Sequence, residues 1–211
     1  MAGVATERGP QCTRAAQDFG VALLDVLATA HRAGFVHRDV KPNNVMVPVG
    51  EGASSTALHL IDFGLVANLE RSVDHATWTR LTGTGFVVGT PPYMAPEQIE
   101  GAALTPQTDL WAVGMLLYWM VTGREPFLAD TATLRMLKSL SDPLEPIATH
   151  APHVSASFAS VVYRALEKDP GRRWLDAEAM SSALATAETD EHPPPGRAAP
   201  SQATRTLVKK R

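Results

Sequence analysis

The spacing of apolar residues along the chain predicts a mainly helical protein. Residues 12–32 place apolar side chains at intervals of three and four, and Gly34 follows as a stop signal. A second helix is predicted over 105–123, where an uncharged apolar stretch is too short to span a bilayer and is therefore expected to be buried on most sides. Weaker helical patterns cover residues 131–140, 155–168 and 175–189.

The remaining segments predict a short hairpin, a long loop and two irregular ends. Two strand-like runs at 44–49 and 57–61 are joined by a turn rich in Gly and Ser. Residues 65–94 lack periodicity, and a loop of that length inside a compact domain is usually functional or disordered. We expect residues 1–10 to be a leader and residues 190–211 to be a disordered tail rich in Pro with a basic end.

Composition narrows the classes of function. Hydrophobic residues make up 45% of the 211 positions and the net charge is −3, so a real core is possible and nucleic acid is not an expected partner. The single cysteine, Cys12, excludes an internal disulfide and a cysteine-based zinc site. No signal peptide or membrane segment is visible in the chain, which fits a cytoplasmic location. His150 and His153 stand three apart near Glu145, but a metal site there is disfavoured.

Four motifs follow one another in a fixed order. Residues 37–44 have the sequence HRDVKPNN, residues 62–64 are DFG, residues 95–97 are APE, and residues 109–114 are DLWAVG. The ordered set resembles the eukaryotic-type protein kinase family, in its bacterial serine/threonine branch, over residues 11–189. The resemblance implies the large, C-terminal lobe of a kinase, mainly α-helical, with short β-hairpin elements at the catalytic loop. It also implies ATP-dependent phosphoryl transfer to Ser or Thr of protein substrates.

The resemblance assigns chemical roles to four residues. Asp39 would accept the proton of the substrate hydroxyl, and Lys41 would lie on the γ-phosphate of ATP. Asn44 and Asp62 offer the hard oxygen atoms that Mg²⁺ prefers. A lysine at position 41 favours serine/threonine substrates over tyrosine.

Other residues match the architecture of the family. His37 and Phe63 resemble two members of the hydrophobic column that links the kinase lobes. Asp109 resembles the aspartate that accepts hydrogen bonds from the backbone of the catalytic loop. Glu97 and Arg173 resemble the buried ion pair of the family, which is costly to break on one side.

The long loop carries candidate sites of regulation. Its spacing is similar to that of bacterial kinases whose paired loop threonines are autophosphorylated, which points to Thr82 and Thr84. Arg38 would then bind the phosphate through charge-assisted hydrogen bonds. Thr90 resembles the hydroxyl that bridges the catalytic aspartate and lysine. The alternatives are phosphorylation at Thr77 or Thr79 and a loop that is not modified.

Part of the kinase pattern has no counterpart in these residues. A kinase places a Gly-rich loop, a strand lysine and a helix glutamate before the catalytic loop. No lysine precedes His37, because the five lysines are Lys41, Lys138, Lys168, Lys209 and Lys210. We therefore expect the small N-terminal lobe to be absent from this chain and the isolated chain to be inactive or very weak, unless a small lobe or kinase partner acts in trans. The alternatives are a catalytically silent docking module that uses residues 90–170, and a gene fragment.

Overall fold

The computed structural model describes residues 12–47, 58–62 and 93–189. The predictions for Phe63, Thr82, Thr84 and Thr90 lie outside the described residues. The expected leader, most of the long loop and the expected basic tail lie outside them as well.

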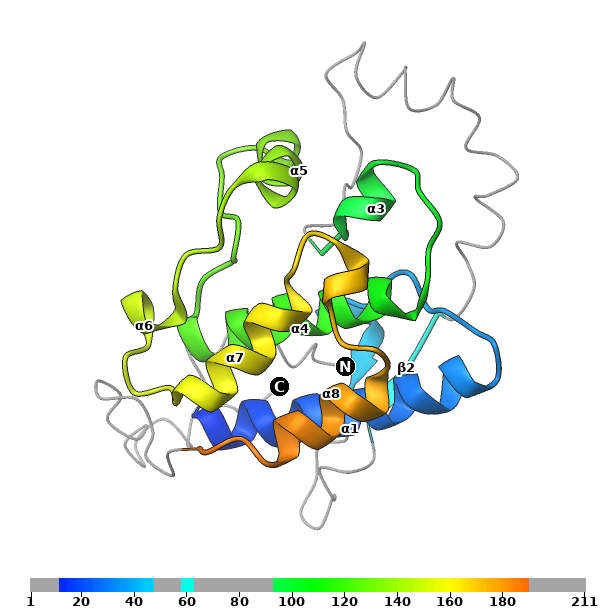
Figure 1. The fold of residues 1–211 in the computed structure, drawn as a ribbon, viewed down its shortest axis with the longest axis horizontal. Coiled ribbons are helices and arrows are strands. Elements are labelled where there is room, and N and C mark those ends of the chain that lie inside the picture. The colour runs from blue at the N-terminus through cyan, green and yellow to red at the C-terminus, as the bar shows by residue number, and fades with distance from the viewer. Residues whose placement is uncertain (1–11, 48–57, 63–92, 190–211) are drawn as a thin grey trace, which may run out of the picture.

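The described residues form a mainly helical structure with one pair of short strands (Figure 1). The prediction of this fold class is confirmed. The long helices are α1 (Thr13–Arg32), α4 (Pro106–Thr122), α5 (Ala132–Ser141), α7 (Ala156–Ala165) and α8 (Ala177–Ala185). The short elements are the 3₁₀ turns η1 (Pro42–Asn44) and η2 (Pro170–Arg172), the strands β1 (Val45–Met46) and β2 (His59–Leu60), and the helices α3 (Pro96–Ile99) and α6 (Ile147–His150).

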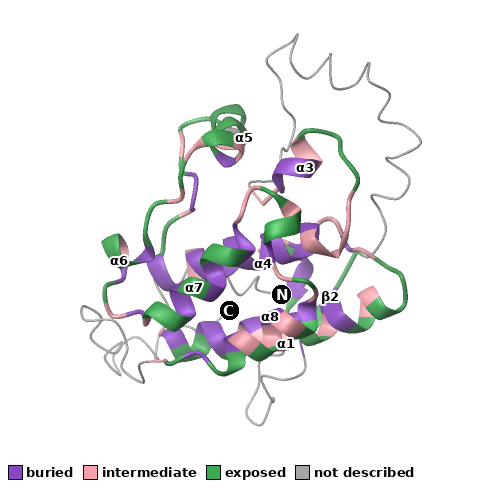
Figure 2. Cartoon of the chain, viewed as in Figure 1, coloured by how far each residue is buried: buried purple, intermediate pink, exposed green. Residues whose placement is uncertain are grey.

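Helix α4 is the centre of the core. Pro106 occupies its first turn, and Gly123 ends it with a φ of 69°, a left-handed conformation that glycine adopts without strain. Every residue from Leu110 to Tyr118 is buried, and Figure 2 shows the burial along the helix. The sequence prediction of a helix buried on most sides is confirmed, because an apolar helix of this length is stable only when neighbouring helices cover it.

Helices α1 and α8 lie side by side (Figure 1), and α1 also packs against α4. Gly20 of α1 permits this close approach, since a Cβ atom there would meet a methyl group of Leu184 at 2.6 Å and one of Leu117 at 2.9 Å. The buried amide of Gln17 donates hydrogen bonds to the carbonyl oxygens of Leu184 and Ala187, at 2.6 and 2.9 Å, and so caps the end of α8. Packing and capping thus join the first described helix to the last.

Strands β1 and β2 pair antiparallel, with Val45 opposite Leu60 and Met46 opposite His59. The predicted runs 44–49 and 57–61 are longer than the strands, each of which has two residues. The ladder extends by one bond, in which the amide of Ile61 donates to the carbonyl of Asn44 at 2.9 Å. This bond holds the beginning of one run beside the end of the other, and it sets the geometry of the site.

Two helix boundaries differ from the sequence prediction, and two short helices were not predicted. The pattern over 155–168 gives α7, which ends at Ala165 before Pro170 opens η2, and the pattern over 175–189 gives α8, which ends at Ala185. Helices α3 and α6 have four residues each, which is too short for a periodic signal. No helix within the described ranges is long and apolar enough to cross a membrane.

Candidate active site

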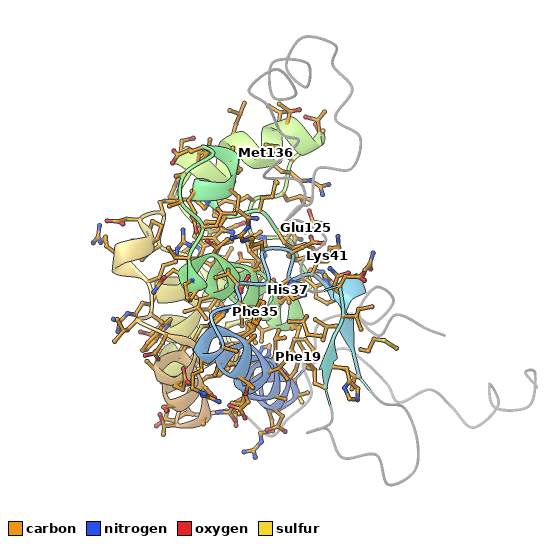
Figure 3. All side chains as sticks on the ribbon, turned by 90° about the vertical axis from the view of Figure 1, so that its right-hand side faces the viewer. Phe19, Phe35, His37, Lys41, Glu125 and Met136 are labelled. Atoms are coloured by element: carbon orange, nitrogen blue, oxygen red, sulfur yellow. The ribbon has the colours of Figure 1, made fainter. Side chains whose placement is uncertain are left out.

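The segment between α1 and β1 brings the side chains of Lys41 and Asn44 to the carboxylate of Asp39. The ammonium group of Lys41 donates to Oδ2 of Asp39 at 2.7 Å, and the amide nitrogen of Asn44 donates to the same oxygen at 3.0 Å. The Asn44 amide also donates to the backbone carbonyl of Asp39 at 2.8 Å. Oδ2 is therefore occupied by two donors, while the side chain of Asp39 keeps 24% of its surface exposed. Figure 3 shows Lys41 and His37 beside the paired strands.

Asp62 lies at the same end of the strand pair as Asn44. The bond between the Ile61 amide and the Asn44 carbonyl sets Ile61 beside Asn44, and Asp62 is the next residue along the chain. His37, which is 1% exposed, contacts the carbonyl of Ile61 through its Nε2 atom at 3.0 Å, so residues 36–44, the candidate catalytic segment, are fastened to the residue just before Asp62. Asp62 itself is exposed. Asn44 and Asp62, the candidate metal ligands, therefore lie at one end of the strand pair.

Two residues of the site have a left-handed backbone. Among residues 12–47, 58–62 and 93–189, the non-glycine residues with positive φ are Arg38, at 68°, and Asp62, at 63°. This conformation costs an L-amino acid roughly 1–2 kcal/mol, and it persists where the surrounding structure holds it in place. One of these residues directly precedes Asp39, and the other is a candidate metal ligand.

Asp109 holds the candidate catalytic segment through its backbone. Its carboxylate accepts hydrogen bonds from the backbone amides of His37, at 2.8 Å, and of Arg38, at 2.7 Å. Nε2 of His31, at the end of α1, lies 2.8 Å from the same carboxylate. Asp109 is 1% exposed and stands in the first turn of α4, where the helix dipole favours a negative charge. One buried carboxylate thus joins α1, α4 and the loop that carries Asp39.

Glu97 and Arg173 form a bidentate ion pair in the interior. The two hydrogen bonds between guanidinium and carboxylate are each 2.7 Å long, and Thr108 donates a third bond to Glu97 at 2.9 Å. Burial opposes ionisation of Glu97. The hydrogen bonds and charge of Arg173 outweigh burial, so the pKa of Glu97 lies below its usual value. The pair fixes α3 against α4 and η2.

Sequence reasoning missed two residues that contact this framework. One is His31, and the other is Gln98, whose side chain donates to the backbone carbonyl of Arg38 at 2.8 Å and accepts from the amide of Ala95 at 3.0 Å. The signal for Gln98 was its position three residues after Ala95, the residue before α3, which is the spacing of a capping box. The sequence carried no signal for the contact of His31, which is 78 residues from its partner.

The donor set suits a magnesium nucleotide better than a metal bound by protein alone. Within the described part of the chain there is no group of three or more His, Cys, Asp or Glu side chains that could hold a metal ion. Mg²⁺ is usually bound by one or two protein oxygens together with phosphates and water. Asn44 and Asp62 can provide these two protein oxygens. His150 and His153 form no such group either, and His150 instead lies 2.9 Å from the Glu145 carboxylate.

Comparison with known proteins identifies the family. The family described as the protein kinase domain matches residues 2–184. The chain belongs to the protein kinase family. It is 38% identical over 164 residues to the serine/threonine-protein kinase pkn3 of Myxococcus xanthus, covering 77% of this chain and 29% of that protein. It is 35% identical over 178 residues to the serine/threonine-protein kinase PknL of Mycobacterium tuberculosis, covering 84% of this chain and 42% of PknL.

A solved structure shows the same fold. The crystal structure of Rad53 1-466 in complex with AMP-PNP matches with a TM-score of 0.61 and 21% sequence identity, over 82% of this chain and 40% of that one. The chain therefore spans less than half the length of these three relatives. The family and the fold are shown over the described helices, and the resemblance stated from the sequence motifs is confirmed.

Proposed function

We propose that this chain is the catalytic large lobe of a serine/threonine protein kinase, which transfers the γ-phosphoryl group of ATP to hydroxyl groups of protein substrates. The observation that carries the proposal is the convergence of Lys41 and Asn44 on Asp39, next to the exposed Asp62. Phosphoryl transfer needs an oriented acceptor hydroxyl and positive charge near the phosphates. Asp39 can orient the hydroxyl, and Lys41 can supply the charge. The identified bacterial relatives carry the same activity in their names.

Asp39 is the proposed acceptor of the substrate proton. Its Oδ2 atom is held by Lys41 and Asn44, which leaves Oδ1 to bind the Ser or Thr hydroxyl and orient that oxygen towards the phosphoryl group. As the bond to phosphorus forms, the hydroxyl proton passes to Asp39 and the bond to the departing diphosphate oxygen breaks. Lys41 would neutralise charge on the transferred group, at the cost of loosening its present contact with Asp39.

Asn44 and Asp62 would hold the metal, and the strand pair would offer a surface for the nucleotide base. The amide nitrogen of Asn44 is engaged by Asp39, so the amide oxygen is the atom left for a cation. When bound, ATP supplies the phosphoryl group and Mg²⁺ neutralises the charge that develops on it. Met46 of β1 and Ile61, the residue after β2, are 47% and 37% exposed and give an apolar surface next to the ligands. An aromatic base would bury that surface.

A second polypeptide segment is part of the proposal. Residues 1–36 contain no lysine that could hold the α- and β-phosphates, so we propose that such a lysine reaches the site from a small lobe, joined to this chain or acting in trans. The 211-residue chain alone would then transfer phosphate very slowly. We further propose that it acts in the cytoplasm and that phosphorylation of Thr82 and Thr84 regulates it through Arg38.

The test compares the parent chain with Asp39→Asn, each alone and each fused behind the small lobe of a bacterial relative, with Mg·ATP and a protein substrate. We expect the fused parent to place phosphate on Ser or Thr about 10² to 10⁴ times faster than the fused variant, since a general base contributes about that factor. We expect no difference between the two unfused chains. Equal rates for the two fusions would refute the proposed chemistry, and rapid transfer by the unfused parent would refute the need for a small lobe.

A docking module is the second candidate function. The observation that favours it is a group of exposed leucines on and before α5: Leu128, Leu134 and Leu137, which are 53%, 47% and 54% exposed. Exposed apolar residues that lie close together often mark a surface for protein partners. The same experiment separates the two functions, because a docking module would bind its partner equally well with Asp39→Asn and show no transfer in any form.

A further inference from the structure

Gln98 connects helix α3 to the residue before Asp39. Its Oε1 atom accepts a hydrogen bond from the amide of Ala95 at 3.0 Å, which fastens the side chain to the start of its own helix. Its Nε2 atom donates to the carbonyl of Arg38 at 2.8 Å, across 60 residues of sequence. The side chain is half-buried, and so the contact is partly shielded from water. Both ends of the amide are therefore used, one locally and one at the catalytic segment.

The carbonyl that Gln98 holds belongs to the peptide that joins Arg38 to Asp39. Arg38 has a φ of 68°, a conformation that an L-residue leaves readily unless its peptide groups are held. Asp109 holds the amide of Arg38 at 2.7 Å, and Gln98 holds its carbonyl at 2.8 Å. The two contacts come from different helices and act on opposite ends of one strained residue. Together they fix the direction in which the backbone enters Asp39.

Helix α3, which carries Gln98, is held in place against the core. Glu97, the residue before Gln98, is held by both terminal nitrogens of the Arg173 guanidinium at 2.7 Å and is 4% exposed. A helix of four residues would not be stable alone, but this ion pair fixes it to the core. A hydrogen bond from Gln98 therefore restrains Arg38 relative to the core.

We propose that Gln98 is a positioning residue, which orients Asp39 by holding the Arg38 carbonyl and so couples the start of α3 to the catalytic segment. Its effect on turnover rests on the proposed kinase function, whereas its effect on the backbone of residues 36–44 does not. Loss of this contact should loosen the catalytic segment while the helical core stays intact.

The test uses the full chain with Gln98→Glu, and with Gln107→Glu as a matched control. Glutamate at position 98 can still accept from the Ala95 amide, but it cannot donate to the Arg38 carbonyl and places a negative charge beside it. Gln107 is also half-buried and donates to a backbone carbonyl, that of Leu175 at 2.7 Å, which lies outside residues 36–44. Both substitutions thus remove one side-chain to backbone bond and add one charge.

The first measurement is amide hydrogen exchange followed by mass spectrometry. We expect exchange in peptides covering residues 36–44 to be about tenfold faster with Gln98→Glu, because a hydrogen bond of this kind contributes about that factor. Peptides from α7 should exchange as in the parent, and Gln107→Glu should match the parent in both regions. Parent-like exchange over 36–44 with Gln98→Glu would overturn the proposal. Faster exchange in α7 as well would overturn it too, since that result indicates general destabilisation.

The second measurement is turnover of the same variants in the fusion that shows Asp39-dependent transfer. We expect Gln98→Glu to lower kcat about tenfold with little change in KM for ATP, because the residue acts on the acceptor side of the reaction. An unchanged kcat would overturn the positioning role. If no form shows Asp39-dependent transfer, the proposed function fails, while the exchange result still decides whether Gln98 holds the catalytic segment.

Discussion

The carboxylate of Glu97 and the guanidinium of Arg173 meet in two parallel hydrogen bonds of 2.7 Å, although the residues are 76 positions apart. Arg173 also donates to the backbone carbonyls of Glu167, Gln107 and Lys168, so all five of its N–H donors are used. The pair thus binds α3, α4 and the η2 region into one unit. Neither member touches Asp39, and we assign the pair to stability rather than chemistry.

We predict that Glu97→Gln lowers the free energy of unfolding by about 3–5 kcal/mol, because it leaves the buried Arg173 without a counter-charge. Urea unfolding at pH 7 measures the loss. Exposed Glu100→Gln, in the turn after α3, is the matched control and should unfold like the parent. The pKa of Glu97 is lowered on folding, so the stability it provides is present above its unfolded-state pKa and is lost as the pH falls through the folded-state pKa. Unfolding of Glu97→Gln at the parent's midpoint would contradict the assignment.

The opposite behaviour is predicted for Asp62→Asn. Asp62 is exposed and has a φ of 63°, a conformation that asparagine tolerates at least as well as aspartate. The proposed function also places Asp39 and Asp62 in one cleft, where their like charges would disfavour the folded state without a metal, and the change removes one of them. We therefore expect an unchanged or slightly higher melting temperature, together with near-complete loss of Mg²⁺-dependent turnover in the fusion. A melting temperature several degrees below that of the parent would show that Asp62 is mainly structural.

Because of Lys168, we expect the free energy of unfolding to depend on pH in an unusual way. Its ammonium group lies 3.8 Å from the centre of the Phe127 ring and donates to the carbonyl of Ser139 at 2.5 Å. Burial, assisted by the charge of Arg173 and opposed by that of Asp142, lowers the pKa of Lys168 to about 8. An unfolded lysine has a pKa of about 10.4, so between these values the unfolded chain binds more protons than the folded one. The free energy of unfolding should therefore rise as the pH rises from about 8 to about 10.

The rise should end near pH 10, where unfolded tyrosines begin to ionise. Burial raises the pKa of Tyr93 and of Tyr118 to about 12, so above pH 10 the folded state holds protons that the unfolded state has lost, and stability falls. Lys168→Met should abolish the rise and keep the fall, whereas exposed Lys138→Met should keep both. Denaturant titrations at pH 7, 8, 9, 10 and 11 test this, and a rise that survives in Lys168→Met would refute it.

Several elements could be predicted because their signals are local. The helices α1 and α4 follow from apolar spacing and from glycines at their ends, and Asp39, Lys41 and Asn44 stand within six residues of one another. The proposed roles of Thr82 and Thr84 stay predictions, since these residues lie outside the described ranges. The lengths of β1 and β2 and the existence of α3 were not predictable from such signals, because elements of two to four residues carry no periodicity.

The sequence by itself determined which residues could do the chemistry, because the order of motifs and the spacing of apolar residues can be read directly from the order of residues along the chain. Only the tertiary structure decided how those residues are held. Gln98 meets Arg38, and His31 meets Asp109, across 60 and 78 residues. Such contacts depend on how packed helices place their side chains in space, and the spacing of residues along the chain does not record that placement. The strained backbone before Asp39 is likewise held at both ends of Arg38 by residues of helices α3 and α4.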